Sequence, residues 1–192
     1  MPTPTPTRTP IPTPTATPCV PFQSGGYWIN CDGTMTDPDT GTMWAQKTGT
    51  FGGAPNPADP NDANNLYTWS TGSPYLLDGT AVTEFLAALN QPPGFAGYTD
   101  WRLPMFEEMN SVLDCTTYPN SCLPTALGST GGFAGYWTAT SNPYTPSNAY
   151  FIYYGGVSSG PKIDAQRFFA VRGAFVTPTP APTPTPEPTP TP

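Results

Sequence analysis

The sequence predicts an α+β domain with two helices in its middle and short strands toward both ends, held between two segments rich in threonine and proline. Three observations support this fold class. The 29 prolines of the 192-residue chain crowd toward its two ends. Two central stretches place apolar residues at helical spacing. Runs of aromatic and β-branched residues, bounded by Gly, Pro, Asn and Asp, precede and follow these stretches.

The two ends of the chain, residues 1–18 and 177–192, are nearly pure Thr-Pro alternation, so we expect extended linkers there. Proline fixes φ at every second residue and removes every second backbone donor, which excludes helix and sheet. One domain therefore occupies residues 19–176, and a domain of this size can bury its own core. Met1 runs directly into the Pro-Thr repeat, and we expect the chain to be part of a longer precursor.

Short strands are expected at 27–29 and 42–44, on either side of a turn-rich segment at 32–41, and together they predict a β-meander. Residues 49–79 are rich in Gly, Pro, Asn and Asp and show no sustained period, so they predict a long irregular loop. Its expected anchors in the core are four apolar or aromatic side chains: Tyr67, Trp69, Tyr75 and Leu76.

The first helix is predicted over 80–90, with Asp78 or Thr80 as its N-cap. The second begins at Pro104, a residue that suits a helix start. Its apolar face is expected to hold Met105, Met109, Val112 and Leu113. Strands are then predicted at 136–140, 149–154 and 168–172, separated by loops that include Gly155-Gly156 and Ser159-Gly160-Pro161.

The four cysteines are compatible with two disulfides in an oxidising compartment, and sequence alone leaves three pairings open. We favour Cys19 with Cys31 and Cys115 with Cys122, because each pair is close in sequence and closes a small loop that contains proline. We expect no membrane insertion, since no apolar run approaches the length of a membrane span. The oligomeric state is not predicted.

The net charge of −7 argues against nucleic acid or another polyanion as partner, because such partners need clustered Lys and Arg. The chain has no histidine, which removes the commonest general base, and it has no nucleophile or phosphate-binding motif. We therefore expect a protein that binds a ligand and has no catalytic residues. Abundant aromatic residues beside Gly, Ser, Thr and Asn suit such recognition.

Several short motifs, in order, resemble the Lcl C-terminal domain family, which is named from a bacterial collagen-like adhesin. These motifs are Asp-Gly-Thr-Met-Thr-Asp (32–37), Gly-Thr-Met-Trp (41–44), Asp-Trp-Arg-Leu-Pro (100–104) with Glu108, Tyr-Trp-Thr (136–138) and Ala-Val-Arg-Gly (170–173). The Asp-Trp-Arg-Leu-Pro element followed by Glu108 is the most specific of them. It also looks like a segment of formylglycine-generating enzymes, but no cysteine here follows their catalytic pattern.

The resemblance implies a C-type-lectin-like fold and an extracellular location, on a bacterial surface or associated with a phage. The best-known member binds sulfated glycans through basic residues, and because this chain is acidic we do not carry that ligand over. Arg102 and Glu108 are expected to form a buried structural pair. The tryptophans inside the family motifs are expected in the core, where such rings contribute much apolar burial: Trp44, Trp101 and Trp137.

The candidate ligand-binding stretch runs from 138 to 167, where tyrosines mix with Ser, Asn and Gly as they do in antibody paratopes. In C-type-lectin-like domains this region commonly forms the ligand face; the alternative is a β-meander whose tyrosines partly pack. The candidate residues are Tyr144, Asn148, Tyr150, Tyr153, Tyr154, Ser158, Lys162, Asp164 and Arg167. The expected partner is a cell-surface glycan or protein.

No cofactor is expected, although Asp32, Asp37 and Asp39 form an oxygen-rich loop that could hold calcium. Their spacing lacks the distal glutamate of an EF-hand, and aspartate also serves turns. Asp59, Asn61, Asp62, Asn64 and Asn65 form a second oxygen-rich cluster, for which a solvated loop is the expected structure. Three functions follow for the chain: an adhesin-type binding module, a structural spacer without a ligand, or a glycosidase-like enzyme.

Overall fold

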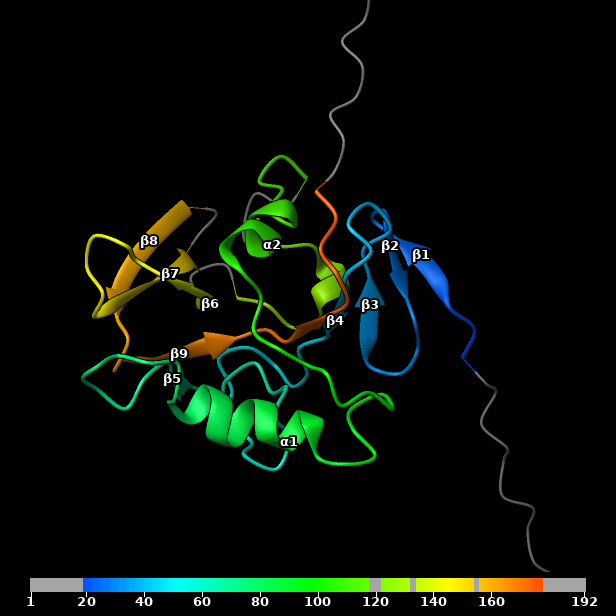
Figure 1. The fold of residues 1–192 in the computed structure, drawn as a ribbon. Coiled ribbons are helices and arrows are strands. Elements are labelled where there is room, and N and C mark those ends of the chain that lie inside the picture. The colour runs from blue at the N-terminus through cyan, green and yellow to red at the C-terminus, as the bar shows by residue number, and fades with distance from the viewer. Residues whose placement is uncertain (1–18, 118–121, 132–133, 154–155, 178–192) are drawn as a thin grey trace, which may run out of the picture.

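The computed structural model describes residues 19–117, 122–131, 134–153 and 156–177. The predicted linkers, except for Thr177, and the candidate residue Tyr154 lie outside these ranges. The described residues form two five-stranded sheets and short helices, which is a mixed α/β architecture. Figure 1 shows the two sheets on opposite sides of the molecule, with α2 between them on one side and α1 below.

The first sheet has the strand order β1-β2-β3-β4-β10, and all its neighbours are antiparallel. Its strands are β1 (Phe22–Ser24), β2 (Tyr27–Ile29), β3 (Thr34–Thr36), β4 (Met43–Ala45) and β10 (Val171–Arg172). The predicted meander is therefore present. The segment 32–41 is not one turn region, however, because β3 lies inside it and its backbone pairs with β2 and β4 on both sides.

The second sheet has the order β5-β9-β6-β7-β8, with β6 and β9 parallel and the other pairs antiparallel. Its strands are β5 (Tyr67–Thr68), β6 (Gly135–Ser141), β7 (Asn148–Tyr153), β8 (Gly156–Pro161) and β9 (Ala165–Phe168). The segment 156–161, predicted as loop, is the edge strand β8. The predicted strand 168–172 is divided between β9 and β10, which belong to different sheets.

The helix predicted over 80–90 is present as a π-helical segment η1 (Ala81–Leu86) that continues into α1 (Ala87–Asn90). Thr80 precedes it without capping it, because its hydroxyl accepts a hydrogen bond from the backbone N–H of Thr68. The second helix, α2 (Phe106–Ser111), begins two residues after Pro104, and Met105 is exposed instead of lying on the apolar face. A short 3₁₀ helix, η2 (Thr125–Leu127), follows the second disulfide.

The loop over 49–79 contains only the short strand β5, as its composition predicts, but its polar side chains are not solvated. Asn61, Asp62, Asn64 and Asn65 are all buried. The side chains of Asp62, Asn64 and Asn65 form hydrogen bonds with the loop's own backbone, so these three hold the loop together from inside. Among the predicted anchors, Tyr67 and Trp69 are buried and Tyr75 is partly buried, whereas Leu76 is exposed.

Two clusters of buried apolar residues meet at the chain segment that connects β9 to β10. Phe168 packs against Phe85 in one cluster, and Phe169 packs against Trp44 in the other, with ring centroids 6.5 and 6.1 Å apart. Successive side chains of an extended segment point to opposite sides, so two neighbouring phenylalanines serve both clusters. Trp101 and Trp137 are buried in the cluster that contains Phe168.

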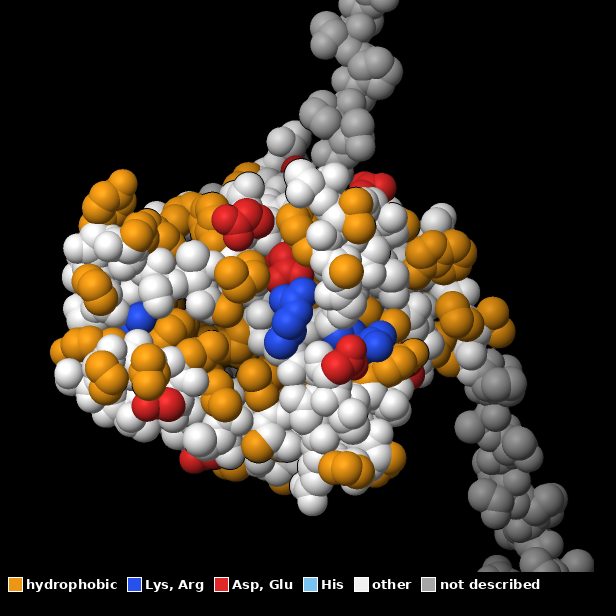
Figure 2. Space-filling model, in the orientation of Figure 1, with side chains coloured by type: hydrophobic (Ala, Val, Ile, Leu, Met, Phe, Trp, Pro, Cys, Tyr) orange, Lys and Arg blue, Asp and Glu red, His pale blue; other side chains and the backbone are white. Residues whose placement is uncertain are grey.

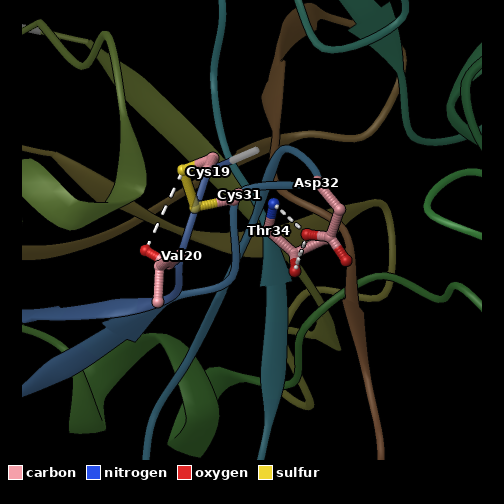
Figure 3. The surroundings of a disulfide bond; sticks show 5 residues. All are labelled: Cys19, Val20, Cys31, Asp32 and Thr34. Carbon is pink, nitrogen blue, oxygen red and sulfur yellow. Dashed lines mark hydrogen bonds between the residues drawn. A yellow bond between two sulfur atoms is a disulfide. The ribbon is translucent and has the colours of Figure 1, made fainter. Parts of the chain in front are cut away.

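Two disulfides join Cys19 to Cys31 and Cys115 to Cys122, which confirms the predicted pairing. The first holds the start of the domain to the end of β2 (Figure 3). Beside it, the carboxylate of Asp32 accepts hydrogen bonds from the backbone N–H and the hydroxyl of Thr34. Two disulfides in so small a domain are typical of proteins that fold in an oxidising compartment.

Candidate functional site

The alternation of side chains along β7 places the predicted ligand-binding residues on two different faces of the second sheet. Phe151 and Tyr153 point to one face and Tyr150 to the other, because successive residues of a strand face opposite ways. The pairing of Phe151 with Ser158 across to β8 places Ser158 on the face of Tyr153. The stretch from 138 to 167 is therefore not a single recognition surface.

An open cleft of about 630 Å³ lies on the face of Tyr153, where β7, β8 and β9 meet the loop that leads to β5. It brings together four of the predicted residues, namely Tyr153, Ser158, Asp164 and Arg167. The remaining lining residues are ones that the sequence did not single out: Leu66, Gly135, Phe151, Ala165 and Gln166.

Arg167 is held firmly at the border of this cleft. Its Nε donates a 2.6 Å hydrogen bond to the carbonyl oxygen of Ala63, and its guanidinium lies 4.8 Å from the ring centre of Phe51. Asp164, by contrast, is exposed in the turn after β8. The cleft thus carries one fixed positive charge and one exposed negative charge beside two aromatic rings.

The opposite face of β7 carries an apolar groove of about 590 Å³. Tyr150 lies there, with its ring 5.8 Å from that of Phe106 at the start of α2. The groove is lined by Phe106, Glu107, Thr140, Ser141, Pro143, Tyr150 and Val157. Tyr144 and Asn148 line neither depression: Tyr144 is 91% exposed in the turn between β6 and β7, and Asn148 is partly buried where β7 begins.

Lys162, predicted to bind ligand, is buried and 3% exposed. Its ammonium group donates hydrogen bonds to Ser141 Oγ at 2.7 Å and to the carbonyl oxygen of Tyr75 at 3.0 Å, and it lies 4.0 Å from the ring centre of Trp69. Burial lowers its pKa. Lys162 therefore fastens the long loop to the second sheet, and it lines neither the cleft nor the groove.

The aspartates proposed for calcium are engaged in turns. Asp37 is buried, and its carboxylate accepts hydrogen bonds from the N–H of Asp39 and the hydroxyl of Thr40. Asp32 accepts two from Thr34 in the same way. Within the described ranges, no three carboxylate, histidine or cysteine side chains converge to hold a metal ion.

Residues 33–172 match the family described as the Lcl C-terminal domain, a range that includes the second sheet, the helices, the cleft and the strands β3, β4 and β10 of the first sheet. The chain belongs to this family. A comparison with curated proteins finds no match. No helix in the part of the chain that the structure describes is long and apolar enough to cross a membrane.

The motif that most strongly indicates the Lcl C-terminal domain forms an ion pair between Arg102, which pairs with β10, and Glu108 in α2. Both nitrogens at the end of Arg102 contact the Glu108 carboxylate at 2.6 Å, and Glu108 is 1% exposed. Glu108 also accepts the N–H of Met105 and so fixes the start of α2. Arg102 further donates to the carbonyl oxygen of Gly173. The hydrogen bond to Glu108 raises the pKa of Arg102.

Surface charge in this Lcl C-terminal domain is mixed. Figure 2 shows Lys and Arg side chains beside Asp and Glu near the centre of one face, with no continuous basic patch among the described residues of that face. Arg172 illustrates the pattern, since its guanidinium bonds to Asp100 and lies 3.7 Å from the ring centre of Tyr98.

The cleft residues of the Lcl C-terminal domain that were not predicted differ in whether the sequence contains a signal for them. Phe151 and Tyr153 are two residues apart and therefore lie on the same face of a strand. The period of two over 148–153 thus points to Phe151. A Cβ at Gly135 would meet the amide oxygen of Gln166, so the glycine leaves room for that side chain. Leu66 arrives from a loop distant in sequence, and only the tertiary structure reveals it.

Proposed function

We propose that this chain is an extracellular or surface-displayed ligand-binding module of the adhesin type, with a C-type-lectin-like fold, carried between extended Thr-Pro linkers at 1–18 and 177–192. The observation that carries the proposal is the open cleft of about 630 Å³ beside Tyr153. Membership of the Lcl C-terminal domain family and the two disulfides support the location. The alternative of a spacer without a ligand leaves this cleft without a role.

The chemistry of the cleft favours a surface glycan of low charge. The rings of Phe151 and Tyr153 offer apolar faces for the C–H groups of a sugar, while Ser158, Asp164 and Gln166 offer hydrogen-bonding groups near them. Asp164 and Arg167 carry opposite charges, so the cleft does not concentrate positive charge for sulfate groups. A loop of a surface protein is the second ligand that such a mixture suits.

The test is binding of the labelled full chain to an array of neutral, sialylated and sulfated glycans and of purified surface proteins, with calcium and with chelator. We expect saturable binding to neutral glycans, equal in both conditions. Tyr153→Ala and Asp164→Ala should each weaken binding roughly tenfold or more, as the loss of a central contact does. Both side chains are exposed, so these variants should fold normally.

Tyr144→Ala is the control, because it removes a tyrosine that is even more exposed than Tyr153, 91% against 47%, and that does not line the cleft. If the Tyr153 variant bound as tightly as the wild type, the cleft would not be the ligand-binding site. A silent array would favour the spacer function. Release of sugars from mixed polysaccharides would favour the third hypothesis, a glycosidase-like enzyme. The acidic side chain that lines the apolar groove is Glu107.

A further inference from the structure

Lys47 and Asn61 are two buried polar side chains that each have one polar atom without a hydrogen-bond partner among the described residues. Lys47 is 4% exposed and Asn61 1% exposed. The ammonium nitrogen of Lys47 and the amide oxygen Oδ1 of Asn61 are both without a partner. Buried polar groups are nearly always paired, so two such atoms require an explanation.

The backbone places these two residues side by side. Thr48 donates its N–H to the carbonyl oxygen of Asn61, and Ala63 donates its N–H to the carbonyl oxygen of Thr48, each at 3.1 Å. This is a parallel pairing of Thr48 with Asp62. It sets Lys47 opposite Asn61 on segments about 5 Å apart, with both side chains leaving toward the same face.

The surroundings of Lys47 favour the uncharged form of its amine. Its nitrogen lies 5.1 Å from the ring centre of Phe85 and 5.7 Å from that of Phe169. Burial lowers the pKa of Lys47 to about 7, against the opposing effect of Asp59. A large fraction of the amine is therefore uncharged near neutral pH.

Asp59 connects the two segments. One carboxylate oxygen accepts the N–H of Asn61 at 2.9 Å, and the other accepts the hydroxyl of Thr48 at 2.7 Å. Asp59 therefore fixes the backbone of Asn61 relative to the residue that follows Lys47. Its negative charge also acts on the amine of Lys47.

We propose that Lys47 and Asn61 form an intramolecular amide cross-link. The uncharged Nζ of Lys47 attacks Cγ of Asn61, and a bond forms between these atoms. A proton passes from the attacking nitrogen, through the carboxylate of Asp59, to the amide nitrogen of Asn61. The bond from Cγ to that nitrogen breaks, and ammonia leaves. No oxidant or reductant takes part, and the product is an amide without charge.

The product suits the site better than the two separate side chains do. An amide carries one N–H and one carbonyl oxygen, whereas an ammonium group carries a charge and three donors that need partners. Removing that charge removes the cost of burying it between Phe85 and Phe169. The bond ties the long loop that begins at residue 49 to the end of the first sheet.

The experiment is mass spectrometry of the purified full chain after unfolding and reduction. The cross-link predicts a mass lower than that of the sequence by one ammonia. It also predicts that trypsin fails to cut after Lys47, so that residues 9–102 remain one peptide, with fragment ions that join Lys47 to Asn61.

Three variants complete the test. Lys47→Met and Asn61→Ala should each restore the full mass, and Asp59→Asn should slow the loss of ammonia. Lys162→Met is the control, since Lys162 is also buried but its nitrogen has partners; it should keep the loss. A full wild-type mass in folded protein, or a loss of ammonia located at other residues, overturns the proposal, and this reading does not depend on whether any variant folds.

Discussion

Arg102 and Arg172 each bond to a carboxylate, and the two pairs differ in the burial of that partner. Glu108 is 1% exposed, whereas the side chain of Asp100 is 58% exposed. Hydrogen bonding to Arg172 lowers the pKa of Asp100, but water surrounds the carboxylate. Because exposed pairs are screened and buried ones are not, the two should differ in their effect on stability.

Carboxylate-to-amide substitutions at these two positions measure that difference. Glu108→Gln should lower the free energy of unfolding by about 2–3 kcal/mol, which is below the usual cost for a buried pair because Arg102 can still reach water. Asp100→Asn should cost less than about 1 kcal/mol. Urea denaturation of both variants checks this, and equal losses would contradict the structural role given to Glu108.

Lys47 provides a prediction for pH in a chain that cannot form the cross-link. In Asn61→Ala the amine remains; burial lowers its pKa to about 7, with Asp59 and Asp62 opposing this and Arg167 adding to it. In the unfolded chain Lys47 has its ordinary pKa of 10.5. Between about pH 7 and pH 10.5 the unfolded chain therefore binds a proton at Lys47 that the folded chain does not bind. Stability should therefore be flat below about pH 7 and rise above it, by up to roughly 4 kcal/mol near pH 10.

The double variant Asn61→Ala with Lys47→Met isolates this effect, since it lacks the amine and should not show the rise. Unfolding midpoints in urea, measured from pH 6 to pH 10, give the comparison. If both chains have the same pH profile, Lys47 is charged in the folded protein.

Among the elements, the end of β4 is held between two segments that are far apart in the sequence. Lys47 pairs with Gly128 on one side, and Thr48 pairs with Asp62 on the other. Gly128 has φ +87°, and a Cβ there would collide with the carbonyl oxygen of Lys47. Gly97 has a similar φ of +82° but open space around it.

These two glycines separate backbone strain from steric collision. Gly97→Ala should cost about 1–2 kcal/mol, the penalty of a left-handed conformation for alanine. Gly128→Ala should cost several kcal/mol more, because the strand junction must open. Thermal unfolding of the two proteins provides the measurement, and a similar loss in both would mean that the junction is not needed for stability.

Strands that depend on neighbours were the elements that the sequence could not predict. The segment 156–161, Gly-Val-Ser-Ser-Gly-Pro, has the composition of a turn, and it is a strand because β7 supplies its hydrogen-bond partners. The strand β3 was likewise hidden by turn residues on both sides. By contrast, η1 and α1 were predictable, since Phe85 and Leu89 repeat at helical spacing and both are buried.

At the scale of the molecule, burial and the disulfides contribute to stability in different ways. Both apolar clusters are built from residues far apart in the sequence. The disulfides close only short separations, 12 and 7 residues. Short loops restrict the unfolded chain modestly, so each bond contributes about 2–3 kcal/mol. The fold should therefore survive their loss.

Replacing all four cysteines with serine tests this balance. We expect a folded chain, with unchanged near-ultraviolet circular dichroism and a melting temperature lower by roughly 10–25 °C. Most of the cleft lies away from both disulfides in the sequence, so glycan binding should persist below that temperature. Loss of the near-ultraviolet signal at low temperature would show that the apolar clusters are insufficient.

The sequence by itself determined the family, the helices and the residue types over 138–167, and it favoured the disulfide pairing that the structure confirms, because motifs, short separations and periodicity are local properties. Only the tertiary structure decided which polar side chains face water. It buried Lys162 against Trp69 and set Tyr153 in a cleft with Leu66. It also paired Thr48 with Asp62, which brings Lys47 beside Asn61. The exposure of a side chain depends on residues from distant segments that pack against it, and composition does not indicate which residues these are.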